Sequence, residues 1–534
     1  MKMMKHIHII CAICAICGLY ACADWDDHYT EDEVAGNQLT LWQQMKNDAT
    51  LSDFCQILEQ TKVFRMHKKT SVSYAQLLDG GQSFTVVAPI NGTFNRDSLL
   101  ELVKTNQGDS LVERFFVFNH LSRSVSSVTP DQQYMLMLNN KHLQIGPDGI
   151  EGVKVNTPNT HAKNGVLHIT DRPLPYRYSI YEALCNQPEL KNIGANLRLY
   201  EEDYFDADHS VSNGIIDGVP VYVDSVVIEY NRMLQRIGYI DAEDSTYWMV
   251  VPTTQGWKQA WEEAKGHFIY DQGMQKRDSL QLYWANHALL SDAIFNMTDQ
   301  KSVQDSLTSV QYSRSTPEYN VFYKPFAPGG ILYGAEVEEC SNGILYKTPV
   351  WPFTPETTYF KELWSEAEST PLIISDKDCT YNVRYLSADS ISKGGYLHIV
   401  PRTATSNWEL TFRVNNTLSG DYDICAIVLP RTVDNPAAGK PCKFRATINY
   451  VDTLGYAQSF NCNNTQFKSD PERVDTVVVA EGFHFPACNY AQTDIKVTVK
   501  LQCSILARET SSYSREMYLD CIYLRPRTSK TEQQ

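Results

Sequence analysis

The sequence predicts a multidomain protein with α+β and all-β parts: two tandem α/β domains followed by a C-terminal, jelly-roll-like β-sandwich. One set of landmarks occurs twice in the first two thirds of the chain, and short alternating strands replace it beyond residue 370. A proline-rich stretch at 349–355 separates the two patterns. The repeated unit is longer than about a hundred residues, which is the size of a domain rather than of a solenoid repeat.

The duplication begins with a helix-like stretch, because residues 40–51 align without gaps on residues 179–190. Each copy then reaches an apolar strand that ends in proline, at 84–89 and 247–252. An Asn-His pair follows, and an Asn-Gly turn leading into a strand closes each copy. The pairs are Asn119-His120 and Asn286-His287, and the turns are Asn164-Gly165 and Asn342-Gly343.

The order of these landmarks resembles the fasciclin (FAS1) domain, which has a first box Phe-Thr-Val-Phe-Ala-Pro-Thr-Asn-x-Ala-Phe, a central Tyr-His and a closing Asn-Gly. Residues 84–94 follow the first box closely. The second copy keeps Val250-Val251-Pro252-Thr253 and then departs from it, and both copies have Asn before the histidine. The resemblance predicts fasciclin-like domains over 38–176 and 177–354. It also implies that His120 and His287 are packing residues of the core.

The N-terminus has the features of a lipoprotein signal peptide over residues 1–21. Lys2 and Lys5 precede an apolar stretch at 9–19 that is too short to span a bilayer. The segment Leu19-Tyr20-Ala21-Cys22 resembles the bacterial lipobox, which makes Cys22 the lipid attachment site, with Cys17 as an alternative.

Residues 22–37 form an acidic tether. Its Asp24, Asp26 and Asp27 resemble the signal that sends lipoproteins of Bacteroidota to the outer face of the outer membrane; the alternative is a merely solvated linker. We therefore expect a lipid-anchored protein of the outer membrane that faces the cell exterior. Expected partners are the membrane through the anchor, a TonB-dependent transporter with its SusD-like lipoprotein, and a glycan.

Composition excludes some function classes. A formal net charge of −16 disfavours nucleic acid as a partner. The spacing of the 14 cysteines shows no zinc-type arrangement, and few disulfides are expected. No nucleophile elbow, phosphate-binding loop or zinc-protease motif occurs. We expect no enzyme activity, no cofactor and no metal.

An insertion lengthens the second copy between its first helix and its apolar strand. It contains an acidic stretch at 201–209 and a hairpin-like segment at 219–228. The acidic stretch is expected to be a solvated loop, with calcium binding as the alternative.

The last part of the chain should be a linker over 355–369, helical from 357, and a β-sandwich over 370–534. Residues 408–414, 422–428 and 495–501 alternate as half-buried strands do. The stretch 408–429 is faintly similar to carbohydrate-binding jelly rolls.

Aromatic residues provide the candidate ligand-binding positions. Trp408 shares one strand face with Leu410 and Phe412, which predicts a core residue. Five other aromatic residues lie in loop-like contexts and are candidates for binding a glycan or a protein, with core packing as the alternative. They are Trp351, Phe353, Phe483, Phe485 and Tyr490.

The sequence thus favours a non-enzymatic surface lipoprotein that acts as an adhesion or interaction module. A role as an accessory subunit of a SusC/SusD-like uptake complex is the more specific expectation. The alternative is a surface glycan-binding protein that uses its C-terminal β-sandwich. A hydrolase is a third reading, for which the sequence pairs no carboxylates.

Overall fold

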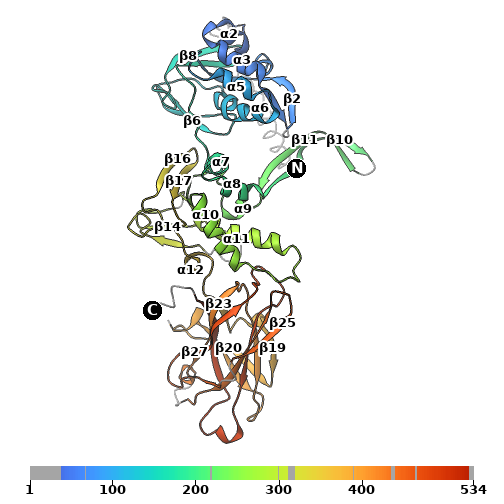
Figure 1. Ribbon diagram of the computed structural model, residues 1–534, viewed down its shortest axis with the longest axis vertical. Helices are drawn as coiled ribbons and strands as arrows, with labels where there is room; N and C mark the ends of the chain where they lie inside the picture. The colour runs from blue at the N-terminus through green and yellow to red at the C-terminus, as the bar shows by residue number, and fades with distance from the viewer. Residues whose placement is uncertain are drawn as a thin grey trace, which may run out of the picture. The chain divides into compact units, whose positions relative to one another are not determined.

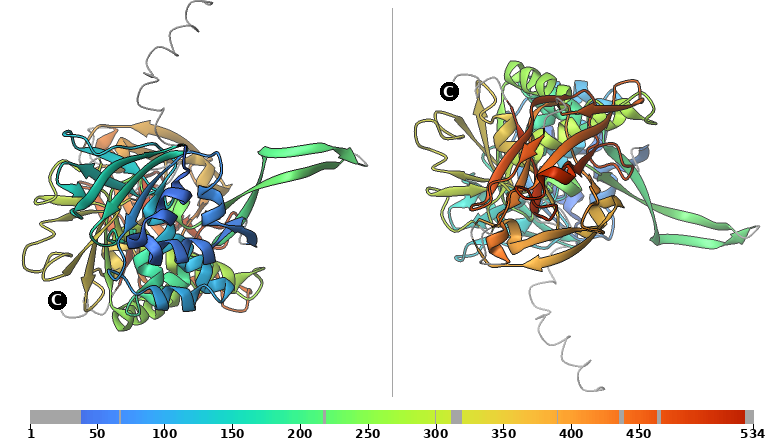
Figure 2. Two further views of the ribbon diagram at one scale, coloured as in Figure 1. Left: turned by 90° about the horizontal axis from the view of Figure 1, so that it is seen from above. Right: turned by 90° about the horizontal axis from the view of Figure 1, so that it is seen from below.

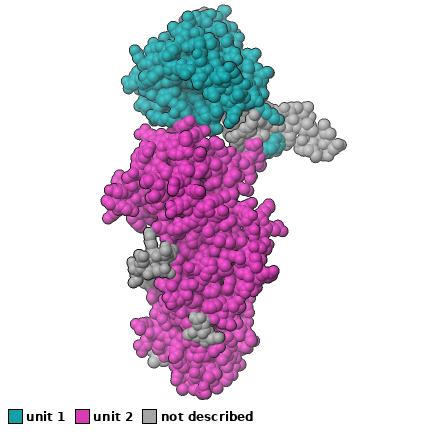
Figure 3. Space-filling view, in the orientation of Figure 1, with its two compact units in different colours: residues 1–177, 205–227 teal, residues 178–204, 228–534 magenta. Residues whose placement is uncertain are grey.

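The computed structural model describes residues 38–65, 68–216, 219–298, 300–310, 319–388, 390–434, 439–462 and 466–527, with the backbone alone over 206–229. The signal peptide, Cys22 and the acidic tether lie outside the described residues. The chain divides into two compact units (Figure 3). One contains the chain up to Arg177 together with Phe205–Val227, and the other contains Tyr178–Tyr204 and Ile228–Gln534.

The first unit is built on a four-stranded sheet with the order β4-β3-β9-β8. Its central strands β3 (Phe84–Pro89) and β9 (Gly165–Thr170) are parallel, and β4 (Leu121–Ser122) and β8 (Val155–Ala162) pair antiparallel at the two edges. All six residues of β3 are buried. A continuous apolar run is what a central parallel strand requires, because both of its faces are covered.

Helices pack against this sheet and are followed by a small second sheet (Figure 1). The helices are α2 (Leu41–Asn47), α3 (Ser52–Gln60), α4 (Tyr74–Leu78), α5 (Arg96–Leu102) and α6 (Asn106–Val112), and α6 continues into a π-helical turn and a 3-10 turn that ends at His120. The remaining strands are the hairpin β1 (Lys62–Arg65) and β2 (Lys68–Ser73), and a sheet of β5 (Gln133–Leu136), β6 (His142–Gly146) and β7 (Gly149–Ile150).

The second unit begins with a sheet of the same design. Its order is β13-β12-β17-β16, again with two parallel central strands, β12 (Tyr247–Pro252) and β17 (Gly343–Thr348). The edges are β13 (Ile294–Asn296) and β16 (Glu336–Cys340), both antiparallel to their neighbours. The predicted apolar strands and the strands after the two Asn-Gly turns are therefore present, and they occupy equivalent positions in the two sheets.

The helices and small strands of this part follow in chain order. They are α7 (Ile180–Asn186), α8 (Lys191–Arg198), α9 (Leu234–Ile237), α10 (Thr254–His267), α11 (Arg277–Ala293) and α12 (Pro355–Thr358), with a pair formed by β14 (Ser306–Thr308) and β15 (Val321–Tyr323).

The first helix of each copy starts at a capping box. Thr40 accepts from the backbone of Gln43, whose side chain bonds back to the cap, and Ser179 and Glu182 do the same in the second copy. A box of this kind satisfies two backbone N–H groups that the start of a helix leaves open. These residues are the first positions of the two aligned stretches.

One asparagine joins the sheet, the first helix and the preceding loop in each copy. Asn164 accepts from the Leu41 N–H at 2.8 Å and donates to the carbonyls of Leu78 and Gly80 at 2.9 and 2.8 Å. Asn342 has equivalent partners at Ile180, Ile240 and Ala242, at 2.8–2.9 Å. Both side chains are buried. We call this arrangement the asparagine joint.

The glycine after each asparagine is required by the close approach of the neighbouring strand. Gly165 has φ +144°, and a Cβ at this position would lie 1.8 Å from the Phe84 carbonyl oxygen. Gly343 has φ +147° and the same distance to the Tyr247 oxygen. Any side chain would push the two central strands apart, so both copies need glycine here.

The insertion in the second copy is a two-stranded hairpin of β10 (Glu201–Ile216) and β11 (Val219–Asn231). The expectation of a loop at 201–209 was therefore wrong, because this stretch pairs as a strand throughout. The hairpin-like pattern at 219–228 is confirmed. Figures 1 and 2 show the hairpin as a long two-stranded ribbon.

The C-terminal part consists of two six-stranded antiparallel sheets (Figure 2). One has the order β20-β21-β29-β23-β27, with β18 also paired to β29; the other has the order β19-β22-β28-β24-β25, with β26 also paired to β24. The first comprises β18 (Leu363–Glu366), β20 (Cys379–Tyr385), β21 (Gly395–Pro401), β23 (Gly420–Leu429), β27 (Asp475–Phe485) and β29 (Met517–Pro526). The second comprises β19 (Ile373–Lys377), β22 (Glu409–Arg413), β24 (Lys443–Val451), β25 (Ala457–Asn461), β26 (Phe467–Lys468) and β28 (Thr498–Cys503).

Buried side chains of both sheets belong to one hydrophobic cluster, which explains the alternating pattern of the strands. Trp408 is fully buried there with Leu410 and Phe412, as predicted, and its indole N–H donates to the Arg515 carbonyl at 2.6 Å. The ten cysteines of the described residues are free thiols, and all except the half-buried Cys185 are buried.

The expectation of a helical connector at 357–369 was wrong for all residues after Thr358. Helix α12 ends at Thr358, and β18 runs antiparallel to β29 with Leu363 opposite Leu524 and Glu366 opposite Cys521. Pairing with a strand far along the chain overrides the local helical preference. In the part of the chain that the structure describes, no helix is both long and apolar enough to cross a membrane.

Replacing the joint asparagine should destabilise its unit strongly. Asn164→Ala removes three hydrogen bonds and leaves three backbone groups without these partners, which we expect to cost about 2–4 kcal/mol. Urea unfolding of the full chain, read by hydrogen exchange of first-unit peptides, measures this. The control is Asn106→Ala, an exposed position in α6, where a change within about 0.5 kcal/mol is expected. Equal effects of the two variants would contradict the role of the joint.

Candidate functional site

A β-bulge in the C-terminal part places an acidic residue in the middle of a sheet. Along β29, Cys521 lies opposite Ile427 and Leu519 lies opposite Val428, so Asp520 has no partner in β23. On its other side β29 pairs with β21 up to Leu519 and with β18 from Cys521 onward. Asp520 therefore occupies the gap between two neighbouring strands. A bulge re-aims side chains that strict alternation would separate.

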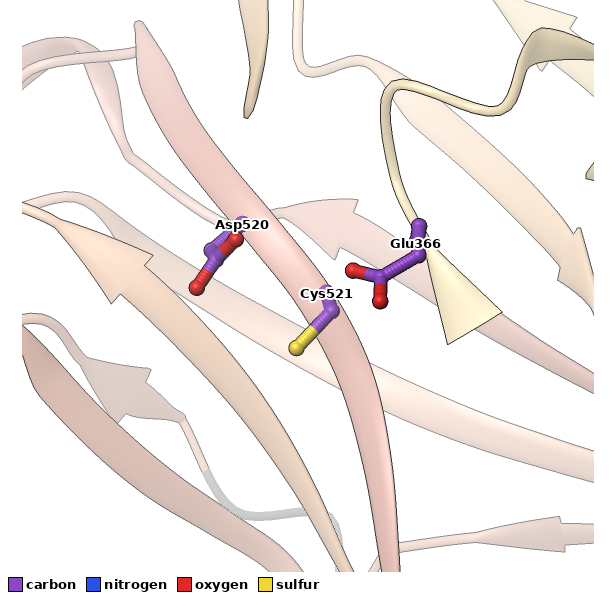
Figure 4. Close-up of side chains that lie close together, drawn as sticks. All are labelled: Glu366, Asp520 and Cys521. Atoms are coloured by element: carbon purple, nitrogen blue, oxygen red, sulfur yellow. The ribbon is translucent and has the colours of Figure 1, made fainter. Parts of the chain in front are cut away.

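The bulge brings together three groups that can bind a metal. One ligand atom each of Glu366, Asp520 and Cys521 lies within 4.8 Å of the others. Figure 4 shows the Glu366 carboxylate directed from β18 toward β29, where Asp520 and Cys521 are consecutive. All three residues are buried, with Glu366 the most exposed at 6%. We call them the acidic cluster.

The polar partners of the acidic cluster leave one buried oxygen unused. Both oxygens of the Asp520 carboxylate accept from the Ser392 N–H, at 3.2 and 3.1 Å. Glu366 Oε1 accepts from the Ser392 hydroxyl at 2.8 Å and lies 3.4 Å from the Lys393 ammonium. Within the described residues Glu366 Oε2 has no hydrogen-bond donor, and the same holds for Oε2 of the neighbouring Glu368.

These groups fit a divalent cation. Burial raises the pKa of the Asp520 carboxyl to about 7, and burial also raises the pKa values of Glu368 and of the Cys521 thiol. A buried carboxylate is stable when a positive charge faces it, and Lys393 supplies only part of this charge because its side chain is 73% exposed. Carboxylate oxygens suit Ca²⁺, and a thiolate would add affinity for Zn²⁺.

Cavities that bind small ligands have volumes of about 300–1,000 Å³. A cavity of about 920 Å³ opens beside the acidic cluster. Its wall includes Glu366 and Asp520 of the cluster, residues of α11, the segment after α12 and loops of the C-terminal sheets. This second feature lies within the second unit, and we call it the α11 cavity.

The segment after α10 bonds to loops of the C-terminal sheets. The Ile269 carbonyl accepts from the Cys488 N–H at 2.7 Å, and the Gln272 N–H donates to the Thr453 carbonyl at 2.9 Å. The buried Asp271 carboxylate pairs with the Lys496 ammonium at 3.1 Å. The second copy and the C-terminal sheets are therefore joined by backbone bonds as well as by a linker.

The predicted aromatic positions are divided between the cavity and the packed interior. Tyr490 lines the α11 cavity, where its ring contacts Phe268 and Trp284. Phe353 and Phe485 are 6% and 0% exposed and offer no ring face to a ligand, which fits the alternative of core packing.

Trp351 and Phe483 are half-buried and contact other aromatic rings. Trp351 lies against Trp257 and Phe353, and Phe483 lies against Tyr450, Phe460 and Phe485. The cavity wall does not include these two residues. Cys22 lies outside the described residues, so its lipidation stays a prediction.

Sequence reasoning missed the acidic cluster. One signal was available, since Asp520 stands within the apolar run from Tyr518 to Leu524, where a half-buried strand would alternate. A charged residue inside such a run indicates a bulge or a site. Its partner Glu366 could not have been found, because the sequence predicted a helical connector where the structure has the strand that carries Glu366.

Both Asn-His pairs are buried, the first in the core of its copy and the second with His287 at the wall of the α11 cavity. Asn119 donates to the carbonyls of Leu174 and Pro175 at 3.3 Å. Asn286 accepts from the Trp261 indole at 3.1 Å and donates to the Tyr200 hydroxyl at 3.0 Å. Both histidines are buried, at 1% and 8% exposure, and burial lowers both pKa values to about 4.

Comparison with known proteins identifies one part of the chain. A family model of the fasciclin domain matches residues 51–176. Residues 51–176 are a fasciclin domain. The match includes the apolar strand, the Asn-His pair and Asn164 of the asparagine joint. No curated protein matches the chain.

One solved structure similar to part of the chain is a FAS1 domain pair from the insect cell adhesion molecule fasciclin I. The two sequences are 13% identical, the match covers 52% of this chain and 90% of that chain, and the TM-score is 0.18. A xylan-binding CBM22-1 domain of Paenibacillus barcinonensis Xyn10C is 12% identical. The match covers 31% of this chain and 93% of that chain, and the TM-score is 0.21. A Paenibacillus xanthan lyase has 17% identity, coverages of 35% and 16%, and a TM-score of 0.22. TM-scores this low do not establish a shared fold.

A divalent cation should stabilise the second unit. Adding Ca²⁺ or Zn²⁺ to EDTA-treated protein should raise Tm, because a ligand at about a hundred times its Kd adds about 2.7 kcal/mol to folding. Glu366→Gln should abolish this shift, and Glu472→Gln, an exposed loop position, should keep it. Calorimetry with each cation measures both. Unchanged melting of the wild type in every cation would rule out a cation at the acidic cluster.

Lowering the pH should destabilise the first unit through His120. The folded histidine stays neutral down to about pH 4, whereas the unfolded one takes up its proton near 6.5. The unfolded chain therefore binds more protons between these values, and the free energy of unfolding falls as pH falls. His120→Gln should lower this slope by up to about 1.4 kcal/mol per pH unit. Urea unfolding between pH 4 and 7 measures the slope, and identical slopes in both proteins would refute the assignment.

Proposed function

We propose that this chain is a non-enzymatic cell-surface lipoprotein that acts as an adhesion or interaction module. The observation that carries the proposal is the fasciclin domain at 51–176, since fasciclin domains are generally modules of this kind. The second copy extends it to a tandem pair, which is supported by the equal order of the two sheets and by the second asparagine joint at Asn342.

The lipid anchor in this proposal rests on the sequence of the first 37 residues. The lipobox-like segment ending at Cys22 and the acidic residues after it support export to the outer face of an outer membrane. On such a surface, the chain would serve as an accessory subunit of a SusC/SusD-like nutrient uptake complex. Two interaction domains held by one lipid leave the C-terminal sheets available for a third partner.

A second candidate function is glycan binding by the C-terminal part, which we treat as a β-sandwich made by its two sheets. The observation that favours it is an aromatic surface beside the sheet edge. Trp364 is 45% exposed, and its ring packs at a tilt of 38° against the ring of the half-buried Tyr523, with ring centroids 4.3 Å apart. Flat rings cover the apolar faces of sugars, and the exposed ring of Trp364 on the sheet offers such a surface.

Affinity purification of the detergent-solubilised protein from its own outer membrane tests the leading proposal. We expect stoichiometric recovery of a TonB-dependent transporter and its SusD-like lipoprotein, identified by mass spectrometry. Cys22→Ser is the matched control, because it removes only the acylated sulfur and should lose both lipid labelling and the transporter. Recovery of the lipidated chain alone would reject the uptake complex, and continued lipid labelling of Cys22→Ser would reject the anchor.

A further inference from the structure

The α11 cavity is lined by aromatic rings together with polar groups. The rings in its wall are those of Phe268, Trp284, Tyr319, Tyr359, Trp364 and Tyr490. Tyr319 and Trp364 are 56% and 45% exposed, so part of each side chain is open to a ligand. A volume of about 920 Å³ accommodates a molecule of two or more rings.

His287 in this wall differs from its counterpart in the first copy. His120 Nε2 accepts from the Leu174 N–H at 3.1 Å, which fixes the proton on Nδ1, and Nδ1 donates to the Phe116 carbonyl at 2.7 Å. Both ring nitrogens of His120 are thus used by the fold. Within the described residues, His287 contacts the rings of Tyr283 and Trp284 but makes no hydrogen bond.

The sequence of the second copy explains this difference. Leu174 follows the last residue of β9, Thr170, by four positions, and the residue at the same distance from Thr348 of β17 is Pro352. Proline has no N–H and cannot supply the bond that His120 receives. His287 is therefore released from the structural role of its counterpart, and its imidazole lies in the cavity wall as a donor and an acceptor.

Several charged groups of the wall are engaged with other groups of the protein, although Glu366 Oε2 has no such partner within the described residues. Asp292 accepts from Ser309 and Asn320, and the Arg413 guanidinium donates to the carbonyls of Gln492 and Thr493. Carboxylates and cationic groups occur together in the wall, so the cavity does not select a ligand of one charge. Exposed rings with a neutral donor and acceptor suit a ligand that has apolar faces and hydroxyl groups.

We propose that the α11 cavity binds a neutral oligosaccharide, with the imidazole of His287 exchanging hydrogen bonds with its hydroxyls and the rings of Tyr319 and Trp364 covering its faces. The inference rests on the glycan-binding candidate function above and moves its site from the C-terminal sheets alone to the cavity they share with α11. The acidic cluster then forms the floor at one end of this cavity.

The test uses the full chain and an array of neutral and uronic-acid oligosaccharides, followed by titration calorimetry with the strongest neutral binder. His287→Phe keeps the ring and removes both nitrogens, and Tyr319→Ala removes an exposed ring. Each should weaken Kd by about tenfold or more. Tyr385→Ala removes another exposed ring, 76% exposed, that is not in the wall, and should leave Kd unchanged. Circular dichroism confirms folding, and His287→Gln replaces His287→Phe if the latter does not fold.

The outcomes separate this inference from the function on which it rests. Saccharide binding that survives in every cavity variant would keep the glycan-binding function and overturn the cavity as its site. Absence of binding to any oligosaccharide would overturn both, and would leave the transporter purification to decide the adhesion function. Preference for uronic-acid oligosaccharides would overturn the assignment of a neutral ligand. The bound sugar should quench tryptophan fluorescence in the wild type. Weaker quenching in Tyr319→Ala would support the cavity as the binding site.

Discussion

The asparagine joint is the constraint on which both copies of the repeated domain depend. A single side-chain amide satisfies the first N–H of one helix and two carbonyls of the loop before the central strand, and it does so from the turn between two strands of the sheet. The adjoining glycine lets the two parallel strands approach to a distance that no other residue permits. Helix, loop and sheet therefore cannot move independently of one another.

The asparagine joint is the same in both copies, but the surroundings of the histidine differ between them. The first copy ends its α6 region in a π-helical turn and a 3-10 turn that carry His120 to its two backbone partners. In the second copy the long helix α11 runs through the same position, and Pro352 removes the donor that the imidazole would need. The histidine that is hydrogen-bonded within the fold in the first copy, His120, therefore corresponds to a residue in the wall of the α11 cavity in the second copy, His287.

The sequence predicted the elements that depend on local pattern and missed those that depend on distant partners. The strands at 84–89 and 247–252 were found because a central parallel strand is a continuous apolar run. The strand at 363–366 was missed, because four residues are too few to show a period and its pairing partner lies at 521–524. The acidic cluster depends on the bulge at Asp520, which only the register of three neighbouring strands reveals.

A comparison of the two equivalent histidines in one native molecule tests whether the second copy has diverged from the first. Diethylpyrocarbonate acylates imidazole nitrogens that are accessible and not hydrogen-bonded. Mass spectrometry measures the extent of acylation at each histidine. If the fold uses both nitrogens of His120 and leaves those of His287 to the cavity, His287 should react well before His120. Equal protection of both would show that His287 is engaged by the fold as His120 is, and would contradict the divergence of the two copies.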